Sequence, residues 1–148
     1  MHVTSSVIPP ASWPARGIAA GVLAICLSWL LVGVQLEANP YGSGTHQQLG
    51  LGQCSFQAER GYACPTCGMT TAFTLATHGR LMEAAIVQPA GALLALALAM
   101  TAWIAGIIAF TGARLEPFVQ PLARRWRSGL LLIAFVLIAG WLTRLAAG

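Results

Sequence analysis

Residues 17–36 have the sequence GIAAGVLAICLSWLLVGVQL, a run of 20 uncharged and mostly apolar residues. At ~1.5 Å per residue, a helix of this length crosses a hydrocarbon core of ~30 Å. The run is longer than the ~7 to 15 apolar residues of a signal peptide, although Leu36-Glu37-Ala38 faintly resembles a cleavage site. We therefore expect an uncleaved membrane span.

The composition of the 148-residue chain agrees with this expectation. Hydrophobic residues make up 57% and charged residues 8% of it, and the mean hydropathy is +0.71. An ordinary soluble domain carries about 25% charged residues. The net charge of +4 comes from arginines that lie beside apolar runs, which favours anionic lipid headgroups over nucleic acid as the partner of the basic residues.

Two further apolar runs predict a second and a third span, the third ending near Arg144, whose side chain would reach the interface. Small residues at four-residue spacing, Gly17 with Gly21 and Gly91 with Ala95 and Ala99, could form close helix contacts or arise by chance. The expected fold is an all-α integral membrane protein with three transmembrane helices plus a short interfacial helix after a cysteine-containing extracytoplasmic loop. Its segments are a tail at 1–16, a first span at 17–36, the cysteine loop and interfacial helix at 37–88, a second span at 90–111, a basic loop at 112–128 and a third span at 129–146.

The arginine distribution predicts the orientation in a bacterial inner membrane. Five arginines fall on the side of the N-terminus and the basic loop, and three on the side of the cysteines. The positive-inside rule then places the N-terminus in the cytoplasm and the cysteine loop in the periplasm or outside the cell. The predicted interface anchors are Trp13, Arg16, Arg124, Arg125, Trp126, Arg127 and Arg144.

The segment Cys64-Pro65-Thr66-Cys67-Gly68 precedes a helix-forming run, Ala72 to His78, which Gly79 would end. Cys67 would lie at or just before the first turn of this helix, where unpaired N–H groups and the helix dipole favour a thiolate. Further candidates are Cys54 and two histidines, of which His46 shares the polar loop and His78 suits a helix C-terminus.

The order of these residues resembles the DUF2752 family of small bacterial membrane proteins. The likeness consists of Cys54, nine intervening residues and Cys64-Pro65-x-Cys67-Gly68-x-Thr70, followed by a short helix and by Pro89 at the start of a span. Thr71 stands where the family pattern usually has Arg, and Gln88 where it has Asn. The resemblance implies a membrane location and a shared cysteine knuckle, without an established activity.

Three hypotheses follow for the cysteines. The first is a structural or accessory membrane protein that binds other membrane subunits, with a disulfide joining Cys54 to Cys64 or Cys67; closing such a loop stabilises by ~2 to 3 kcal/mol. The second is thiol-disulfide exchange by Cys64 and Cys67, with Cys54 as relay to a partner or a quinone. The third is a zinc site built from Cys54, Cys64, Cys67 and His46. No cofactor is favoured by the sequence, and hydrolase or phosphate-binding motifs are missing from it.

Overall fold

The computed structural model describes residues 11–61, 64–113 and 125–147, and within these ranges every regular element is helical. The elements are α1 (Trp13–Gln35), a 3-10 helix η1 (Thr45–Leu49), α2 (Ser55–Arg60), α3 (Met69–Thr77), α4 (Leu81–Val87), α5 (Pro89–Thr111) and α7 (Trp126–Ala147).

Two helices, α1 and α5, are long and apolar enough to cross a membrane. Each has 23 residues, an apolar window of mean hydropathy 2.3 and only 17% of that window buried inside the molecule. The core helix of a soluble protein would be mostly buried. The third predicted span lies in α7, whose described apolar stretch, Ser128–Leu142, is shorter.

Helices α1 and α5 pack through small side chains. On α1 the buried residues are Ala19, Cys26 and Gly33, which recur every seven positions. Among the residues of α5 that face the bundle, Ala95 and Ala102 have the same spacing. A seven-residue repeat of this kind keeps one helix face against its neighbour. The burial of Cys26 agrees with a packing role for this thiol.

Of the small residues at four-residue spacing, only some lie in helix contacts. Gly91 and Ala95 are buried, whereas Ala99 is exposed. Gly17 and Gly21 are exposed as well, and a Cβ atom at either would meet no atom within 4 Å in the described structure. The four-residue spacing on α1 therefore does not mark its packed face.

Helix α3 forms where a short helix was predicted, but it is not an amphipathic helix lying on a surface. It packs against α1, α4 and α5. Thr74, which helical spacing places on the same side as Thr70 and Thr77, is fully buried. Its apolar residue Phe73 approaches α1 at Gly33, where an added Cβ would lie 2.6 Å from the ring. The helical spacing of threonines shows which residues share a face, but it does not show whether that face meets water or a neighbouring helix.

Proline and glycine residues mark several helix ends in the structure. Helix α1 begins at Trp13, with Pro14 in its first turn, so the last residues of the predicted tail are helical. Gly79 ends α3 at φ 79°, and Pro89 opens α5 instead of kinking a longer helix. The segments η1 and α2 were not predicted; they are short and have little periodicity.

Of the predicted interface anchors, Arg16 has contacts that the structure describes. Its Nε–H donates to the Ala109 carbonyl at 3.0 Å, and its Nη2 donates to Phe110 O at 3.4 Å. A cation at this point satisfies carbonyls at the C-terminal end of α5 and complements the helix dipole. Trp13 and Arg125 are exposed. Arg124 and the side chains of Trp126, Arg127 and Arg144 lie outside the described residues.

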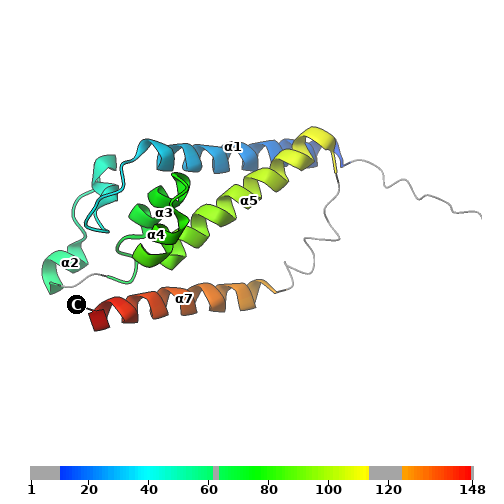
Figure 1. Cartoon of the computed structure of the whole chain (residues 1–148). Coiled ribbons are helices and arrows are strands. Elements are labelled where there is room, and N and C mark those ends of the chain that lie inside the picture. Colours follow the sequence, from blue (N-terminus) through cyan, green and yellow to red (C-terminus); the bar gives the residue numbers. More distant parts are fainter. Residues whose placement is uncertain (1–10, 62–63, 114–124, 148) are drawn as a thin grey trace, which may run out of the picture.

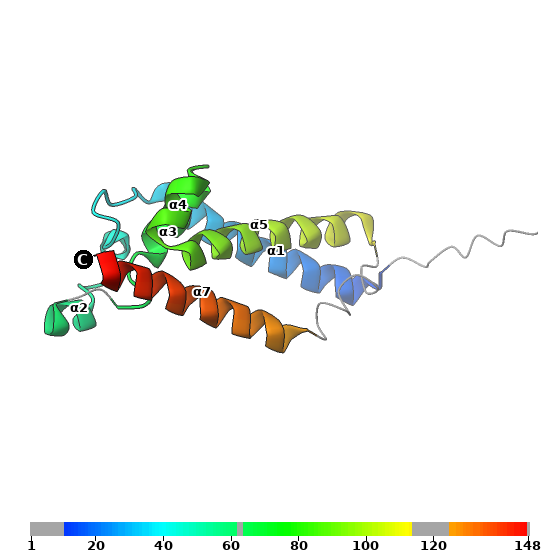
Figure 2. The ribbon, with the colours of Figure 1, turned by 60° about the horizontal axis from the view of Figure 1, so that its bottom comes forward.

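The helices alternate in direction, as Figure 1 shows. The start of α1, the end of α5 and the start of α7 lie at one end of the molecule. The short helices α2, α3 and α4 lie at the other end, together with the end of α7 (Figures 1 and 2). The cysteine segment is therefore gathered at one end of the long helices.

The closest approach of α5 to α3 yields a prediction. A Cβ at Gly91 would lie 2.5 Å from the Met69 carbonyl oxygen and 2.9 Å from the Ala72 Cβ. We expect Gly91→Ala to lower the stability of the detergent-solubilised protein by about 1–3 kcal/mol, because backbone atoms must move. The measurement is unfolding monitored by circular dichroism.

The matched control is Gly21→Ala, which places the same methyl group in open space on α1. It should leave stability unchanged or raise it slightly, since alanine is the better helix former. Equal stability of the two variants would contradict the packing described.

Candidate functional site

The cysteine motif forms a tight turn that leads into α3. The Cys67 N–H donates to the Cys64 carbonyl at 3.0 Å, and the Met69 N–H donates to the Thr66 carbonyl at 3.1 Å. Gly68, at the N-cap of α3, has φ 82°. Glycine adopts this backbone conformation without the steric cost that a side chain would bring. The turn folds Cys67 back toward Cys64.

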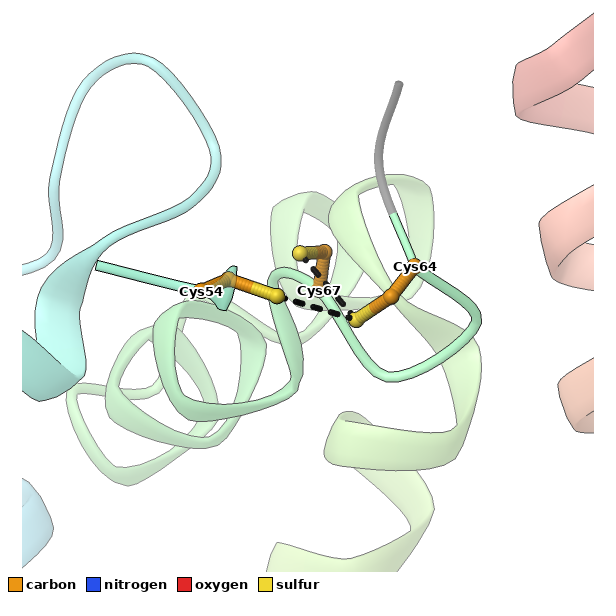
Figure 3. A group of neighbouring side chains, drawn as sticks. All are labelled: Cys54, Cys64 and Cys67. Atoms are coloured by element: carbon orange, nitrogen blue, oxygen red, sulfur yellow. Dashed lines mark hydrogen bonds between the residues drawn. The ribbon is translucent and has the colours of Figure 1, made fainter. Parts of the chain in front are cut away.

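The three cysteine sulfurs of this region converge, and dashed lines join the Cys64 sulfur to the other two (Figure 3). The Sγ atom of Cys64 lies 3.6 Å from that of Cys54 and 3.3 Å from that of Cys67. All three sulfurs lie within 4.8 Å of one another. These separations exceed the ~2.05 Å of a disulfide, so the three residues are thiols in this structure and the predicted disulfide remains a prediction.

The two cysteines of the motif differ in acidity. Burial alone would raise the pKa of Cys64, but hydrogen bonds from the Thr66 hydroxyl, from Cys67, from the Thr66 backbone and from Cys54 lower it to about 7. Burial and hydrogen bonding to Cys64 raise the pKa of Cys67 to about 12. The expectation that Cys67 would be the thiolate was therefore wrong. It failed because Cys67 is buried and lies beside the more acidic Cys64 thiol.

Gln88 connects the cysteine turn to the long helices. Its side chain is fully buried, and its Nε2–H donates to the Pro65 carbonyl at 2.8 Å. Gln88 occupies the position of the asparagine in the family pattern, and its amide supplies the same kind of donor with one more methylene. Its Oε1 atom faces α7, lying 3.0 Å from where a Cβ at Gly140 would be.

A second buried link holds η1 against α3. The hydroxyls of Thr45 and Thr71 are 2.8 Å apart, and both side chains are almost fully buried. The Asn39 N–H donates to the Thr45 Oγ1 atom at 3.0 Å. Thr71 is the residue that stands in place of the family's arginine. In this chain the position therefore makes a neutral hydrogen bond within the fold.

The two histidines have different surroundings. His78 is exposed and forms the C-cap of α3, and its Nδ1–H donates to the Thr74 carbonyl at 2.8 Å. His46 is half-buried in η1, and its Nε2–H donates to the Gly52 carbonyl at 3.2 Å. Among the described residues, the ligand atoms that lie within 4.8 Å of one another are the three sulfurs, and neither histidine belongs to this set.

Two hollows are lined by residues of the cysteine cluster. One, of about 360 Å³, is lined by Cys64 and by the first turn of α3. The other, of about 380 Å³, is lined by polar side chains of the loop after α1 and by Gln53 and Gln57. Gly44, His46, Cys54 and Cys67 line both. A small ion or molecule can thus reach the sulfurs from the loop side.

These features define a class of protein: an all-helical chain with two long apolar helices and a three-cysteine cluster at one end of them. Residues 54–102 match the family model of DUF2752, described as a protein of unknown function. The resemblance noted from the cysteine spacing is confirmed over this range. No curated protein and no solved structure matches the chain significantly.

Sequence reasoning missed three residues that shape the site. Gln88 and Thr71 were noted only as departures from the family pattern, and Thr45 was not noted at all. No local signal marks Thr45, because its partner is 26 positions away. The Gln88-Pro89 pair carried a usable signal, since an amide directly before a helix-opening proline can reach a neighbouring turn.

The acidity of Cys64 can be measured by alkylation. In reduced, metal-free protein, the rate of Cys64 modification by iodoacetamide should rise with pH and reach half its maximum near pH 7, because the thiolate is the reactive form. Cys67 should stay unmodified throughout the neutral range. Peptide mapping by mass spectrometry follows each residue, and preferential labelling of Cys67 would contradict the assignment.

The Thr45–Thr71 hydrogen bond can be tested with valine, which has the same shape as threonine. Thr71→Val should destabilise the protein by about 1–3 kcal/mol, because it leaves a buried hydroxyl without this partner. Thr45→Val should cost at least as much, since it also removes the acceptor of the Asn39 N–H.

A double-mutant cycle completes this test. The variant carrying both substitutions should lose less stability than the sum of the two single losses, because each single change already breaks the bond. Strict additivity of the two losses would show that the hydroxyls do not interact.

Proposed function

We propose that this protein is a multi-pass integral membrane protein of the bacterial inner membrane whose extracytoplasmic cysteine knuckle binds one thiophilic metal ion. We further propose that it serves as an accessory or assembly component of a larger membrane complex. The observation that carries the metal proposal is the convergence of Cys54, Cys64 and Cys67 within 4.8 Å.

The membrane assignment is supported by the exposed apolar surface of the long helices. Large side chains such as Trp29, Trp103 and Phe110 are more than half exposed, and in water such a surface would be very unfavourable. The cysteine segment and the end of α7 lie at the same end of the long helices (Figure 1), which supports placing them on one side of the bilayer. The excess of arginines at the opposite end supports a cytoplasmic N-terminus.

The metal assignment is supported by the number and spacing of the sulfurs. Around a tetrahedral zinc ion with Zn–S bonds of ~2.3 Å, neighbouring sulfurs are ~3.8 Å apart. The measured distances of 3.3 and 3.6 Å are close to this value. A disulfide would use only two of the three sulfurs, whereas one soft cation such as Zn²⁺ or Cu⁺ uses all of them.

The surroundings also suit a bound thiolate. The Thr66 backbone and hydroxyl both hydrogen-bond to Cys64, and hydrogen bonds to a thiolate ligand stabilise its charge. Acidic side chains do not line either hollow in the described residues, so oxygen-preferring cations such as Ca²⁺ find no carboxylate ligands there. The donor set therefore selects for soft metals.

An accessory role is supported by the small size of the polar region and by the exposed helix faces. The described structure offers one cluster of chemistry-bearing side chains, and much of α1, α5 and α7 presents large apolar residues outward. Lipid and the helices of other subunits are the partners of such faces. In this proposal the knuckle gives the protein a metal-dependent shape at the bilayer surface.

Thiol-disulfide exchange is the second candidate, and the Cys64–Cys67 distance of 3.3 Å favours it. Oxidation would join these two sulfurs, release two protons and transfer two electrons to a protein disulfide or a quinone, which becomes a dithiol or a quinol. The pair also has the arrangement of an accessible, more acidic thiol beside a buried one. Metal binding and disulfide formation exclude each other at any moment, so the redox state of isolated protein distinguishes them.

The proposal predicts the metal content of the protein. The full chain, purified in detergent under argon, should bind about one Zn²⁺ per molecule, measured by elemental analysis after gel filtration. Cys64→Ser should abolish binding, because the Cys64 sulfur lies within 3.6 Å of Cys54 and 3.3 Å of Cys67 and would be a shared ligand of the site (Figure 3). Cys26→Ser is the matched control, since Cys26 is buried on α1, and should bind like the unaltered chain.

The isolated protein could instead contain no zinc and carry a Cys64–Cys67 disulfide that opens in mild reductant and re-forms with oxidant. This result would contradict metal binding and support thiol-disulfide exchange. A reductant-resistant bond from Cys54 with one remaining thiol would instead favour the structural disulfide predicted from the sequence.

A further inference from the structure

The hydrogen bond between His46 and Gly52 decides which nitrogen of the imidazole ring is available. A carbonyl oxygen can only accept, so the His46 Nε2 atom carries the hydrogen in this 3.2 Å contact. In the neutral ring, Nδ1 then carries the lone pair. Histidine ligands of metal ions are commonly oriented in this way, with the second ring nitrogen donating to a backbone carbonyl.

The position of His46 is set by its neighbour in the sequence. Thr45 is fully buried and is joined to Thr71 of α3 through the 2.8 Å contact between their hydroxyls. Thr71 lies four residues after Cys67, so this link connects η1 to the helix that the cysteine turn begins. His46 consequently lines both hollows in common with Cys54 and Cys67.

His78 lacks these features. It is exposed at the far end of α3 from the cysteine turn, and it lines neither hollow. Its Nδ1–H caps the Thr74 carbonyl, a role that explains a histidine at a helix C-terminus without a metal. It is therefore the natural control residue.

We infer that His46, through Nδ1, is the fourth ligand of the metal ion bound by Cys54, Cys64 and Cys67, and that the Thr45–Thr71 hydrogen bond is the device that positions it. This inference rests on the proposed metal-binding function and specifies its ligand set as Cys₃His. That set is a common structural zinc site, and it closes the coordination sphere.

Binding requires His46 to move closer to the sulfurs, because the ligand atoms within 4.8 Å of one another are the sulfurs alone in the described part of the chain. The segment that carries His46 has room to do so. Gly44 and Gly50 flank η1 at φ 91° and 75°, and the hollow beside it measures about 380 Å³. Glycines at both ends let a short segment adjust its backbone at low cost.

Co²⁺ provides the probe, since it replaces Zn²⁺ in tetrahedral sites and its visible absorption depends on the ligand set. The reduced full chain in detergent micelles is titrated with Co²⁺ under argon. We expect tetrahedral ligand-field bands together with a sulfur-to-cobalt charge-transfer band. His46→Ala should lower the affinity about 10-fold or more and weaken the ligand-field bands, because water replaces the nitrogen.

Three further variants make the experiment specific. His78→Ala should match the unaltered chain in both spectrum and affinity. Thr71→Val should weaken binding and leave the spectrum unchanged, as a positioning residue would. His46→Cys should restore tight binding with a stronger charge-transfer band, which shows that the loss in His46→Ala does not come from misfolding.

The outcomes separate this inference from the function on which it rests. If the unaltered chain binds no Co²⁺, the metal-binding proposal itself fails, and the inference fails with it. If the chain binds Co²⁺ and His46→Ala has the same spectrum and affinity, the knuckle binds metal but His46 is not a ligand. Loss of the nitrogen-dependent bands in His78→Ala instead would also overturn the assignment.

Discussion

The hydrogen bond from the buried Gln88 amide to the Pro65 carbonyl is the contact on which the arrangement of this molecule depends. Gln88 also ends α4, through its N–H to the Ala84 carbonyl, and begins α5, because its own carbonyl accepts from Gly91 and Ala92. A single residue thus joins the cysteine turn, the short helices and a long apolar helix. The position of the sulfurs is consequently tied to the packing of α5 on α1.

The site is built from segments far apart in the chain. Cys54 comes from the residue before α2, Cys64 and Cys67 from the turn before α3, and the half-buried His46 from η1. The cysteine segments have little apolar core of their own. The buried apolar cluster nearby lies on α3, α4 and α5 and consists of Ala72, Leu75, Ala84 and Ala92. Small extramembrane regions with little core are commonly stabilised by a metal or a disulfide. In the metal account, binding supplies this stabilisation and uses every sulfur of the cluster.

The sequence predicted those features that depend on neighbouring residues in the chain, namely the long apolar helices and several helix ends. Hydrophobic run length predicted α1 and α5, and Gly79 and Pro89 fixed helix ends because their backbone preferences act within one turn. The spacing of the cysteines left open a disulfide, an exchange pair and a metal site. The burial of side chains could not be predicted from local sequence. Thr74 shares a helix face with Thr70 and Thr77, yet it is fully buried. The expected thiolate at Cys67 was wrong for the same reason, since the pKa of a thiol depends on whether the fold covers it.

X-ray absorption at the zinc edge directly identifies the ligand atoms of a zinc ion bound at the cysteine cluster. Protein purified without added reductant or chelator and loaded with one equivalent of Zn²⁺ should show three sulfur scatterers at ~2.3 Å and one nitrogen at ~2.0 Å. A first shell made only of nitrogen and oxygen atoms would contradict the account, because the converging sulfurs would then not be ligands.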